Sequence, residues 1–300
     1  VGRFDLHPYA ALPLVWRGWG LRPEIALRNT FYTERLLPSA PGTVGRPVAD
    51  PVNRRALEAA FELRPPALSR VFDRTLLGRQ VKHAFEPRLV YRYVQGVDSF
   101  PNIIRFDARD ILSDTNEVEY GVINRLYARR ATSGCPPNRA QEQETGSSKL
   151  ETSNCPAARE ILSWEIAQKY FLDPDFGGAV VNGRRNVFTT TAEFTGIAFL
   201  TEPRRFSPII SRLRAQSAGA ADIEWHLDYD TRKGRVSSSI ALVNFALGHF
   251  AMGGGHTFLH APGETIVSQP IPSPERFNQF RTLVRWGHPN KRGWNAGATV

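Results

Sequence analysis

No stretch of this 300-residue sequence reaches the roughly 18 consecutive apolar residues that a membrane-spanning helix requires, so a helical membrane fold is excluded. Methionine occurs only once, whereas aromatic residues make up 11% of the chain, a balance that favours a β-rich protein. The hydrophobic fraction of 41% and the mean hydropathy of −0.33 resemble those of a soluble protein. A membrane barrel can share that composition, because its strands place apolar residues only at every second position.

The sequence also lacks a basic stripe, although its net charge is +9. The arginines are scattered along alternating segments, often near glutamates, so nucleic-acid binding is not expected. No signal peptide opens the chain, and its first and last residues fall within alternating segments. We therefore expect a fragment of a larger protein, for which missing targeting signals carry no information about location.

The clearest pattern lies between Arg159 and Arg214. Apolar residues dominate every second position from Leu162 to Leu172, and the alternation resumes at residues 188–200 after a break at residues 173–178. Because successive strand side chains point to opposite faces, a period of two predicts one apolar and one hydrated surface. Such runs are about twice the usual strand length of ~5–6 residues, and suit a tilted strand crossing a bilayer, which needs roughly 9–11.

The same alternation predicts strands through the rest of the chain. They cover residues 3–16 (interrupted by Pro8 and Pro13), 21–32, 53–64, 81–94, 114–130, 222–230, 235–247, 250–260, 277–287 and 293–300. Residues 53–64 contain good helix formers and could form a short helix, but their place between two loops favours a strand. In total, about twelve or thirteen strands in a hairpin meander indicate an all-β, antiparallel transmembrane β-barrel, present only in part.

Charged residues gather on one face of these strands, which predicts a hydrated lumen where opposite charges pair across strands. The candidate lumen-facing residues are Arg22, Arg28, Lys82, Glu86, Arg88, Arg92, Glu117, Glu119, Arg125, Glu165, Lys169, Glu193, Arg212 and Arg214. The residues expected to face lipid are Leu162, Trp164, Ile166, Phe188, Phe194 and Trp225. An arginine at Ile166 should therefore disturb assembly far more than loss of the Lys169 side chain.

Three sequence features could suggest chemistry, but each has a structural explanation. His256 and His260 would lie roughly 13 Å apart on a strand, too far for one metal ion. The glycines at 253–255 are followed by neither a helix nor Lys-Ser/Thr, as a phosphate loop would require. Asp228 and Asp230, about 7 Å apart on a strand, have a glycosidase-like spacing without a supporting motif. We expect no catalytic site, no metal site and no cofactor.

The two cysteines, Cys135 and Cys155, flank one polar, low-complexity segment at residues 131–158. In an oxidising compartment two loop cysteines usually pair, so a local disulfide is predicted. A free thiol or a metal role is the alternative.

Several longer strings resemble the barrel of the LPS-assembly protein family, LptD, over essentially the whole chain. They are residues 103–107 (IIRFD), 112–117 (LSDTNE), 162–170 (LSWEIAQKY), 196–203 (GIAFLTEP), 228–234 (DYDTRKG) and 289–293 (PNKRG). The resemblance implies a cell outer-membrane barrel, surrounded by outer-membrane lipid, that receives lipopolysaccharide from a periplasmic transport bridge and releases it to the outer leaflet. It also implies that a plug lipoprotein of the LptE type fills the lumen.

Two departures from the family matter. The periplasmic jelly-roll domain and many barrel strands are not present here, so residues 1–300 are expected to form part of one barrel domain. The cysteine positions do not match the family's arrangement, and its disulfide pattern is therefore not carried over to Cys135 and Cys155.

The expected function is that of an outer-membrane translocon component that assembles lipopolysaccharide into the outer leaflet, without an enzymatic step. The alternative is a general diffusion porin or another outer-membrane channel. Arginine and lysine outnumber acids on the predicted lumen face, and such a wall would attract the phosphates of lipopolysaccharide. Pairing of these charges within the wall, or with the plug lipoprotein, is the other explanation.

Overall fold

The structure, a computed structural model, describes residues 2–37, 46–76, 78–97, 102–104, 110, 112–131, 156–175, 177, 202–217, 221–260, 276–287 and 296–299. Its regular elements in this part of the chain are all β-strands, which confirms the predicted all-β class. None of these residues belongs to a helix with the length and apolarity needed to cross a membrane.

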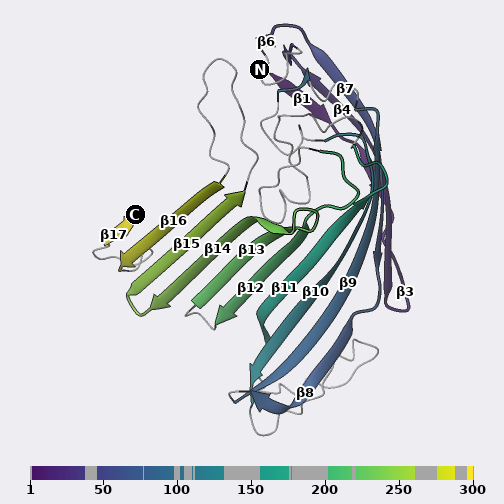
Figure 1. The fold of residues 1–300 in the computed structure, drawn as a ribbon. Coiled ribbons are helices and arrows are strands. Elements are labelled where there is room, and N and C mark those ends of the chain that lie inside the picture. Colours follow the sequence, from purple (N-terminus) through teal and green to yellow (C-terminus); the bar gives the residue numbers. More distant parts are fainter. Residues whose placement is uncertain are drawn as a thin grey trace.

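The strands form one large antiparallel sheet and a small two-stranded one (Figure 1). Their bounds are β1 (Arg3–Leu6), β2 (Tyr9–Ala11), β3 (Leu14–Trp16), β4 (Trp19–Tyr32), β5 (Arg35–Leu36), β6 (Pro47–Val48), β7 (Val52–Arg64), β8 (Leu68–Leu76), β9 (Arg79–Gln95), β10 (Thr115–Arg130), β11 (Arg159–Phe171), β12 (Ile209–Ser217), β13 (Ala221–Asp230), β14 (Arg235–Leu247), β15 (Phe250–His260), β16 (Arg276–Trp286) and β17 (Ala296–Thr299). Hydrogen bonding runs in the order β1-β4-β7-β9 and then consecutively from β10 to β17.

Local sequence explains where the strands break. The first predicted strand is divided into β1, β2 and β3 at Pro8 and Pro13, because proline has no amide hydrogen to donate to the ladder. All three pieces pair with β4. The turn from β3 to β4 places both Arg17 (φ 47°) and Gly18 (φ 82°) in the left-handed region, as a two-residue hairpin of the favoured twist requires.

The segment that could have been a helix is strand β7. It pairs with β4 on one side and β9 on the other, so backbone bonds to two neighbours decide its conformation over the helix propensity of its residues. Several strands are far longer than an average globular strand, including β9 with 17 residues and β10 with 16. These lengths suit strands that cross a bilayer at a tilt.

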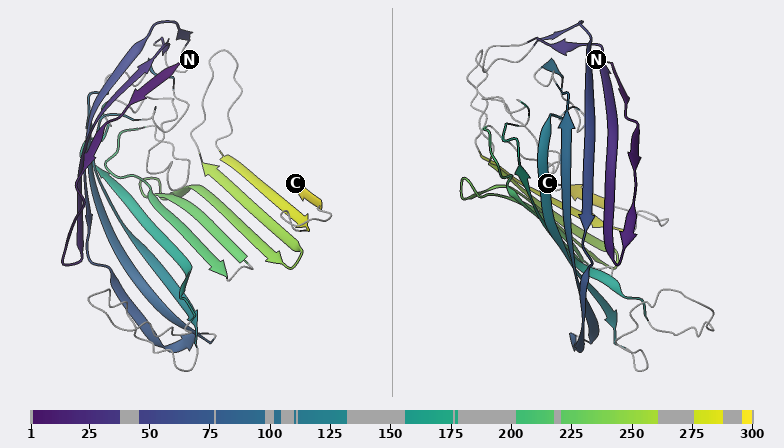
Figure 2. Two further views of the ribbon diagram at one scale, coloured as in Figure 1. Left: turned by 180° about the vertical axis from the view of Figure 1, so that it is seen from behind. Right: turned by 90° about the vertical axis from the view of Figure 1, so that its right-hand side faces the viewer.

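The sheet curves strongly, so that it has a convex and a concave face (Figures 1 and 2). We call the end at which β9 and β15 finish and β10 and β16 begin the upper end, and the end that carries β8 and the β3–β4 turn the lower end, as drawn in Figure 1. Within the described residues, the pairing runs from β1 to β17, and these two outer strands do not pair with each other. A small apolar cluster of Ala56, Val94 and Val97, with Leu112 against it, lies at the upper end.

Candidate functional site

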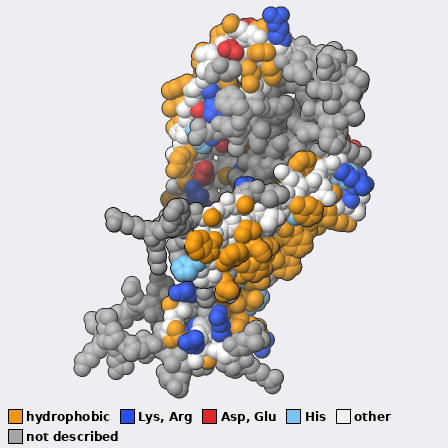
Figure 3. All heavy atoms as spheres, turned by 90° about the vertical axis from the view of Figure 1, so that its left-hand side faces the viewer, with side chains coloured by type: hydrophobic (Ala, Val, Ile, Leu, Met, Phe, Trp, Pro, Cys, Tyr) orange, Lys and Arg blue, Asp and Glu red, His pale blue; other side chains and the backbone are white. Residues whose placement is uncertain are grey.

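The two faces of the sheet differ in chemistry. Large apolar side chains stand exposed on the convex face, for example Leu27 (60%), Phe61 (39%) and Trp225 (41%). Figure 3 shows hydrophobic side chains gathered in a band over one side of the molecule. In the register, these positions alternate with the charged residues of the concave face. The convex face is thus suited to lipid and the concave face to water.

Polar side chains on the convex face are paired across strands. The hydrogen bonds join His83 with Asn124 (3.2 Å), Tyr120 with Gln168 (2.6 Å), Trp164 with Ser211 (2.9 Å) and Trp225 with Ser239 (3.0 Å). In the last two, the indole Nε1–H donates to the serine Oγ. Hydrocarbon offers no hydrogen-bonding partner, so this pairing satisfies polar tips that lipid would leave unsatisfied.

The register shows where the fourteen predicted lumen residues lie. Those on the concave face are Arg22 and Arg28 on β4; Lys82, Glu86, Arg88 and Arg92 on β9; Glu117, Glu119 and Arg125 on β10; Glu165 and Lys169 on β11; and Arg212 and Arg214 on β12. Leu162, Trp164, Ile166 and Trp225 lie on the opposite face. Glu193, Phe188 and Phe194 fall outside the described residues, as do Cys135 and Cys155, whose pairing remains a prediction.

The concave charges form ion pairs that cross from strand to strand. The pairs are Arg28–Glu58 (3.1 Å), Arg88–Glu62 (2.8 Å), Arg88–Glu119 (3.7 Å), Arg125–Glu86 (3.2 Å), Arg125–Glu160 (2.8 Å), Arg212–Glu224 (3.3 Å) and Arg214–Asp222 (3.7 Å). Several members stay partly exposed: the side chains of Arg88, Arg212 and Arg214 are 38%, 39% and 50% exposed. Exposed pairs of this kind are weak, and their charges remain available to a ligand.

One pair on this face is buried. The Lys169 Nζ lies 2.5 Å from Glu117 Oε1, and the two side chains are only 3% and 7% exposed. Residues next to β11 hold the lysine backbone, since Ser207 Oγ accepts a bond from the Lys169 amide and the Ser207 amide donates to the Lys169 carbonyl. Lys169 is therefore a buried partner of Glu117, although its place in the alternating pattern predicts a hydrated position.

A second buried cluster was not predicted from the sequence. Asp110, fully buried, accepts hydrogen bonds from Arg3 Nη1 (2.9 Å) and from the Tyr32 hydroxyl (2.7 Å). Arg54 Nη1 donates to the carbonyls of Asp110 and Leu112, both at 3.2 Å. These contacts fix part of the β9–β10 connection against β1, β4 and β7. Nothing in the sequence signalled a role for Asp110, which lies between the strings at residues 103–107 and 112–117 that resemble the family.

The concave face becomes more apolar at β14–β16. Leu242 (44%), Leu283 (42%) and Phe277 (41%) are exposed there, on the face that carries charges from β4 to β13. Gly253 and Gly255 lie between them, and a Cβ at Gly255 would come within 3.1 Å of the Leu242 side chain. We call this surface the apolar strip. The charged side chains at the described concave positions of these strands are three arginines, Arg281, Arg285 and, at the start of β14, Arg235, without an acid among them.

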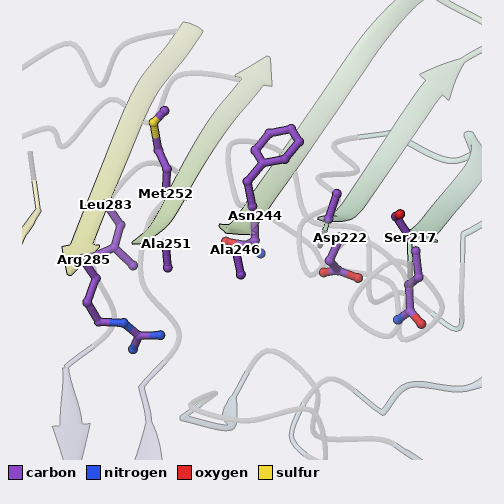
Figure 4. A pocket seen from close by; sticks show the side chains of 12 residues that line it. Ser217, Asp222, Asn244, Ala246, Ala251, Met252, Leu283 and Arg285 are labelled. Atoms are coloured by element: carbon purple, nitrogen blue, oxygen red, sulfur yellow. The ribbon is translucent and has the colours of Figure 1, made fainter. Parts of the chain in front are cut away.

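A shallow hollow of about 420 Å³ crosses the lower ends of β12–β16 beside the apolar strip. In Figure 4 the Asp222 and Arg285 side chains point to one side of the sheet and Met252 points to the other. The hollow thus joins the end of the charged wall to the apolar strip.

The comparisons with known proteins agree with this geometry. A family model described as "LptD: LPS transport system D" matches residues 1–287, which is nearly the whole chain. A comparison with curated proteins found no match.

Proposed function

The chain belongs to the LptD family, and from this membership we propose how the two faces of its sheet serve transport. The protein is an outer-membrane β-barrel component that assembles lipopolysaccharide at the outer membrane, and lipopolysaccharide is its cargo. The alternation is also compatible with a general diffusion porin, but the family match does not support that function. We propose that the convex face contacts membrane lipid and that the concave face lines the path of the hydrophilic part of the cargo.

The observation that carries this proposal is the consistent sorting of side chains by face. From β4 to β13, large exposed apolar residues stand on the convex side, whereas arginine, lysine and glutamate face the concave side in register. Saccharides and phosphates need a hydrated wall with hydrogen-bonding groups, which the concave face offers. Arginine can hold a phosphate through two hydrogen bonds at once.

Burial decides which charges could meet the cargo. Lys169 and Glu117 are enclosed, so they are unsuited to bind anything that passes. Arg212 and Arg214 are about half exposed on β12, and Arg92 lies on the same face of β9. We propose that these three arginines interact with cargo phosphates.

We expect that replacing Arg92, Arg212 and Arg214 together by glutamine slows lipopolysaccharide delivery several-fold at a normal barrel level, because three phosphate-binding groups are lost. Surface-exposed lipopolysaccharide would be measured by pulse labelling of cells that carry the full-length protein. The matched control is Asp222→Asn with Glu224→Gln, which breaks the ion pairs of Arg212 and Arg214 but leaves both cations. Equal slowing in both variants would show that delivery depends on the ion pairs of Arg212 and Arg214 and not on phosphate binding by the arginines, which would contradict the proposal.

We further propose that the apolar strip is covered by a plug lipoprotein of the LptE type, which would leave the charged wall to the cargo. Exposed leucine and phenylalanine inside a hydrated lumen favour a protein cover, because burial of apolar area stabilises association. A photo-crosslinking residue at Leu242 should therefore capture that partner in the full-length protein. The control is the next position, Val243, which lies on the convex face and should capture no partner.

Membership of the family also supports a proposal about the domain organisation. We propose that residues 1–300 form part of one barrel domain, because one continuous sheet joins the described strands from β1 to β17 other than β5 and β6. The periplasmic transport bridge would then be contacted by an N-terminal domain of the full-length protein.

A further inference from the structure

Three arginines converge at the lower end of the convex face. Arg79 begins β9 and Arg130 ends β10, and the two are direct partners in the antiparallel register. Arg159 begins β11, where its partner in the register is Ala128, the next residue of β10 on the same face as Arg130. All three side chains are exposed. We call these residues the rim triad.

The rim triad is electrostatically uncompensated within the described part of the protein. Like charges directly opposite each other on neighbouring strands destabilise a sheet. No ion pair joins Arg79, Arg130 or Arg159 to a described carboxylate. By contrast, each paired arginine of the concave wall lies within 4 Å of an acid. The nearby Glu160 carboxylate belongs to the concave side and pairs with Arg125 at 2.8 Å. An anion would therefore stabilise the triad.

The surroundings of the triad favour an amphiphilic ligand. The three arginines line a hollow of about 700 Å³ at the ends of β9–β12, together with Ala128, Pro156 and Ala157. The hollow reaches around the strand ends to concave-side residues, which are Arg129, Glu160 and Gln216. Two residues further along β9, Val81 begins the apolar part of the convex face, and Leu126 and Leu162 continue it on β10 and β11. The arginines thus border the surface that faces lipid.

A second feature of the lower end agrees with a membrane boundary there. Trp16 and Trp19 are direct partners on the convex face beside the β3–β4 turn and are 64% and 39% exposed. The Arg17 guanidinium lies over the Trp16 ring, 5.1 Å from its centre. Tryptophan is enriched where a membrane protein passes from hydrocarbon to headgroups.

We propose that Arg79, Arg130 and Arg159 form a binding site for the phosphate headgroup of a membrane amphiphile at the outer wall of the barrel. The inference rests on the proposed contact of the convex face with lipid. Guanidinium groups hold phosphate oxygens through paired hydrogen bonds, and an acyl chain of the same molecule can lie along the apolar convex face. The three arginines lie on the opposite face of the sheet from the charges that we propose meet the cargo.

The test uses native mass spectrometry of the full-length protein in mild detergent, titrated separately with phosphatidylglycerol, with lipid A and with diacylglycerol, which has no phosphate. The wild type should bind at least one phosphate-bearing lipid ten-fold or more tightly than diacylglycerol. Replacing the rim triad by glutamine should remove that difference. Whether phosphatidylglycerol or lipid A binds more tightly identifies the source of the phosphate.

The matched control replaces Arg55, Arg70 and Arg276 by glutamine. These arginines also lie on the convex face, but on three separated strands, β7, β8 and β16, so the control removes the same charge without removing a cluster. It should keep the preference of the wild type. Should the triple triad variant fail to assemble, Arg130→Gln alone should weaken binding about three-fold.

Unchanged lipid preference in the triad variant, or an equal loss in the control, would overturn the proposal. The readout is lipid bound to purified protein, and delivery of lipopolysaccharide in cells does not enter it. A failure of this site is therefore distinguishable from a failure of the proposed roles of the two faces.

Discussion

Replacing Lys169 by methionine is expected to destabilise the barrel by about 3–5 kcal/mol, because it leaves the Glu117 carboxylate buried without its cation. Glu119, whose Oε2 lies 3.9 Å from the Lys169 Nζ, loses a second favourable interaction. The free energy of unfolding would be measured in urea for the full-length barrel refolded into lipid vesicles. The alternating pattern predicts that Lys169 lies on a hydrated wall, where loss of its side chain would have little effect on assembly. Lys169 is buried, so that expectation was wrong.

The matched control for Lys169→Met is the double variant Lys169→Met with Glu117→Gln. It removes the uncompensated charge and keeps a group of similar volume, so it should recover most of the lost stability. A loss of less than about 1 kcal/mol in the single variant would show that water reaches the pair, as it does in exposed ion pairs.

The second large effect is expected for Ile166→Arg on the convex face. Ile166 lies at the middle of β11 between Val122 and Ser211, and an arginine at a lipid-facing midplane position costs about 2–4 kcal/mol. The amount of assembled barrel in cells should fall, and unfolding in lipid vesicles should require less urea. Heat-modifiable migration in gels reports the first quantity directly.

Ile123→Arg is the control for Ile166→Arg. It makes the same substitution on the neighbouring strand β10, but on the concave face, where Glu86 and Glu165 are its direct partners. An arginine between two carboxylates on a hydrated wall should leave the barrel level nearly unchanged. Equal losses from the two substitutions would contradict the assignment of faces.

Local sequence was sufficient to predict most of the long strands and the sorting of their side chains. The period of two in residues 159–171 corresponds to β11, and the prolines at 8 and 13 correspond to the breaks around β2. The path of hydrogen-bonded strands from β1 to β17 agrees with the hairpin meander. Alternation is a property of each strand alone, because consecutive side chains point to opposite faces whatever the strand pairs with.

Propensity was a weaker guide where two conformations competed. Residues 53–64 contain good helix formers, and strand β7 exists because β4 and β9 both pair with it. The extra strand β8 beside the lower part of β9 was not predicted either. In both cases the deciding hydrogen bonds come from other segments of the chain.

The sequence by itself therefore determined the class of fold, the two chemically distinct faces and, through its resemblance, the family. Only the tertiary structure decided which charges are buried, which are paired and which are left without an acid. Lys169 and Glu117 are 52 residues apart, and Arg3 and Asp110 are 107 apart. Arg79 faces Arg130 across a strand pair. Strand register and loop placement bring these residues together. A periodic pattern predicts the face on which each residue lies, but it does not predict which residue lies beside it on the next strand.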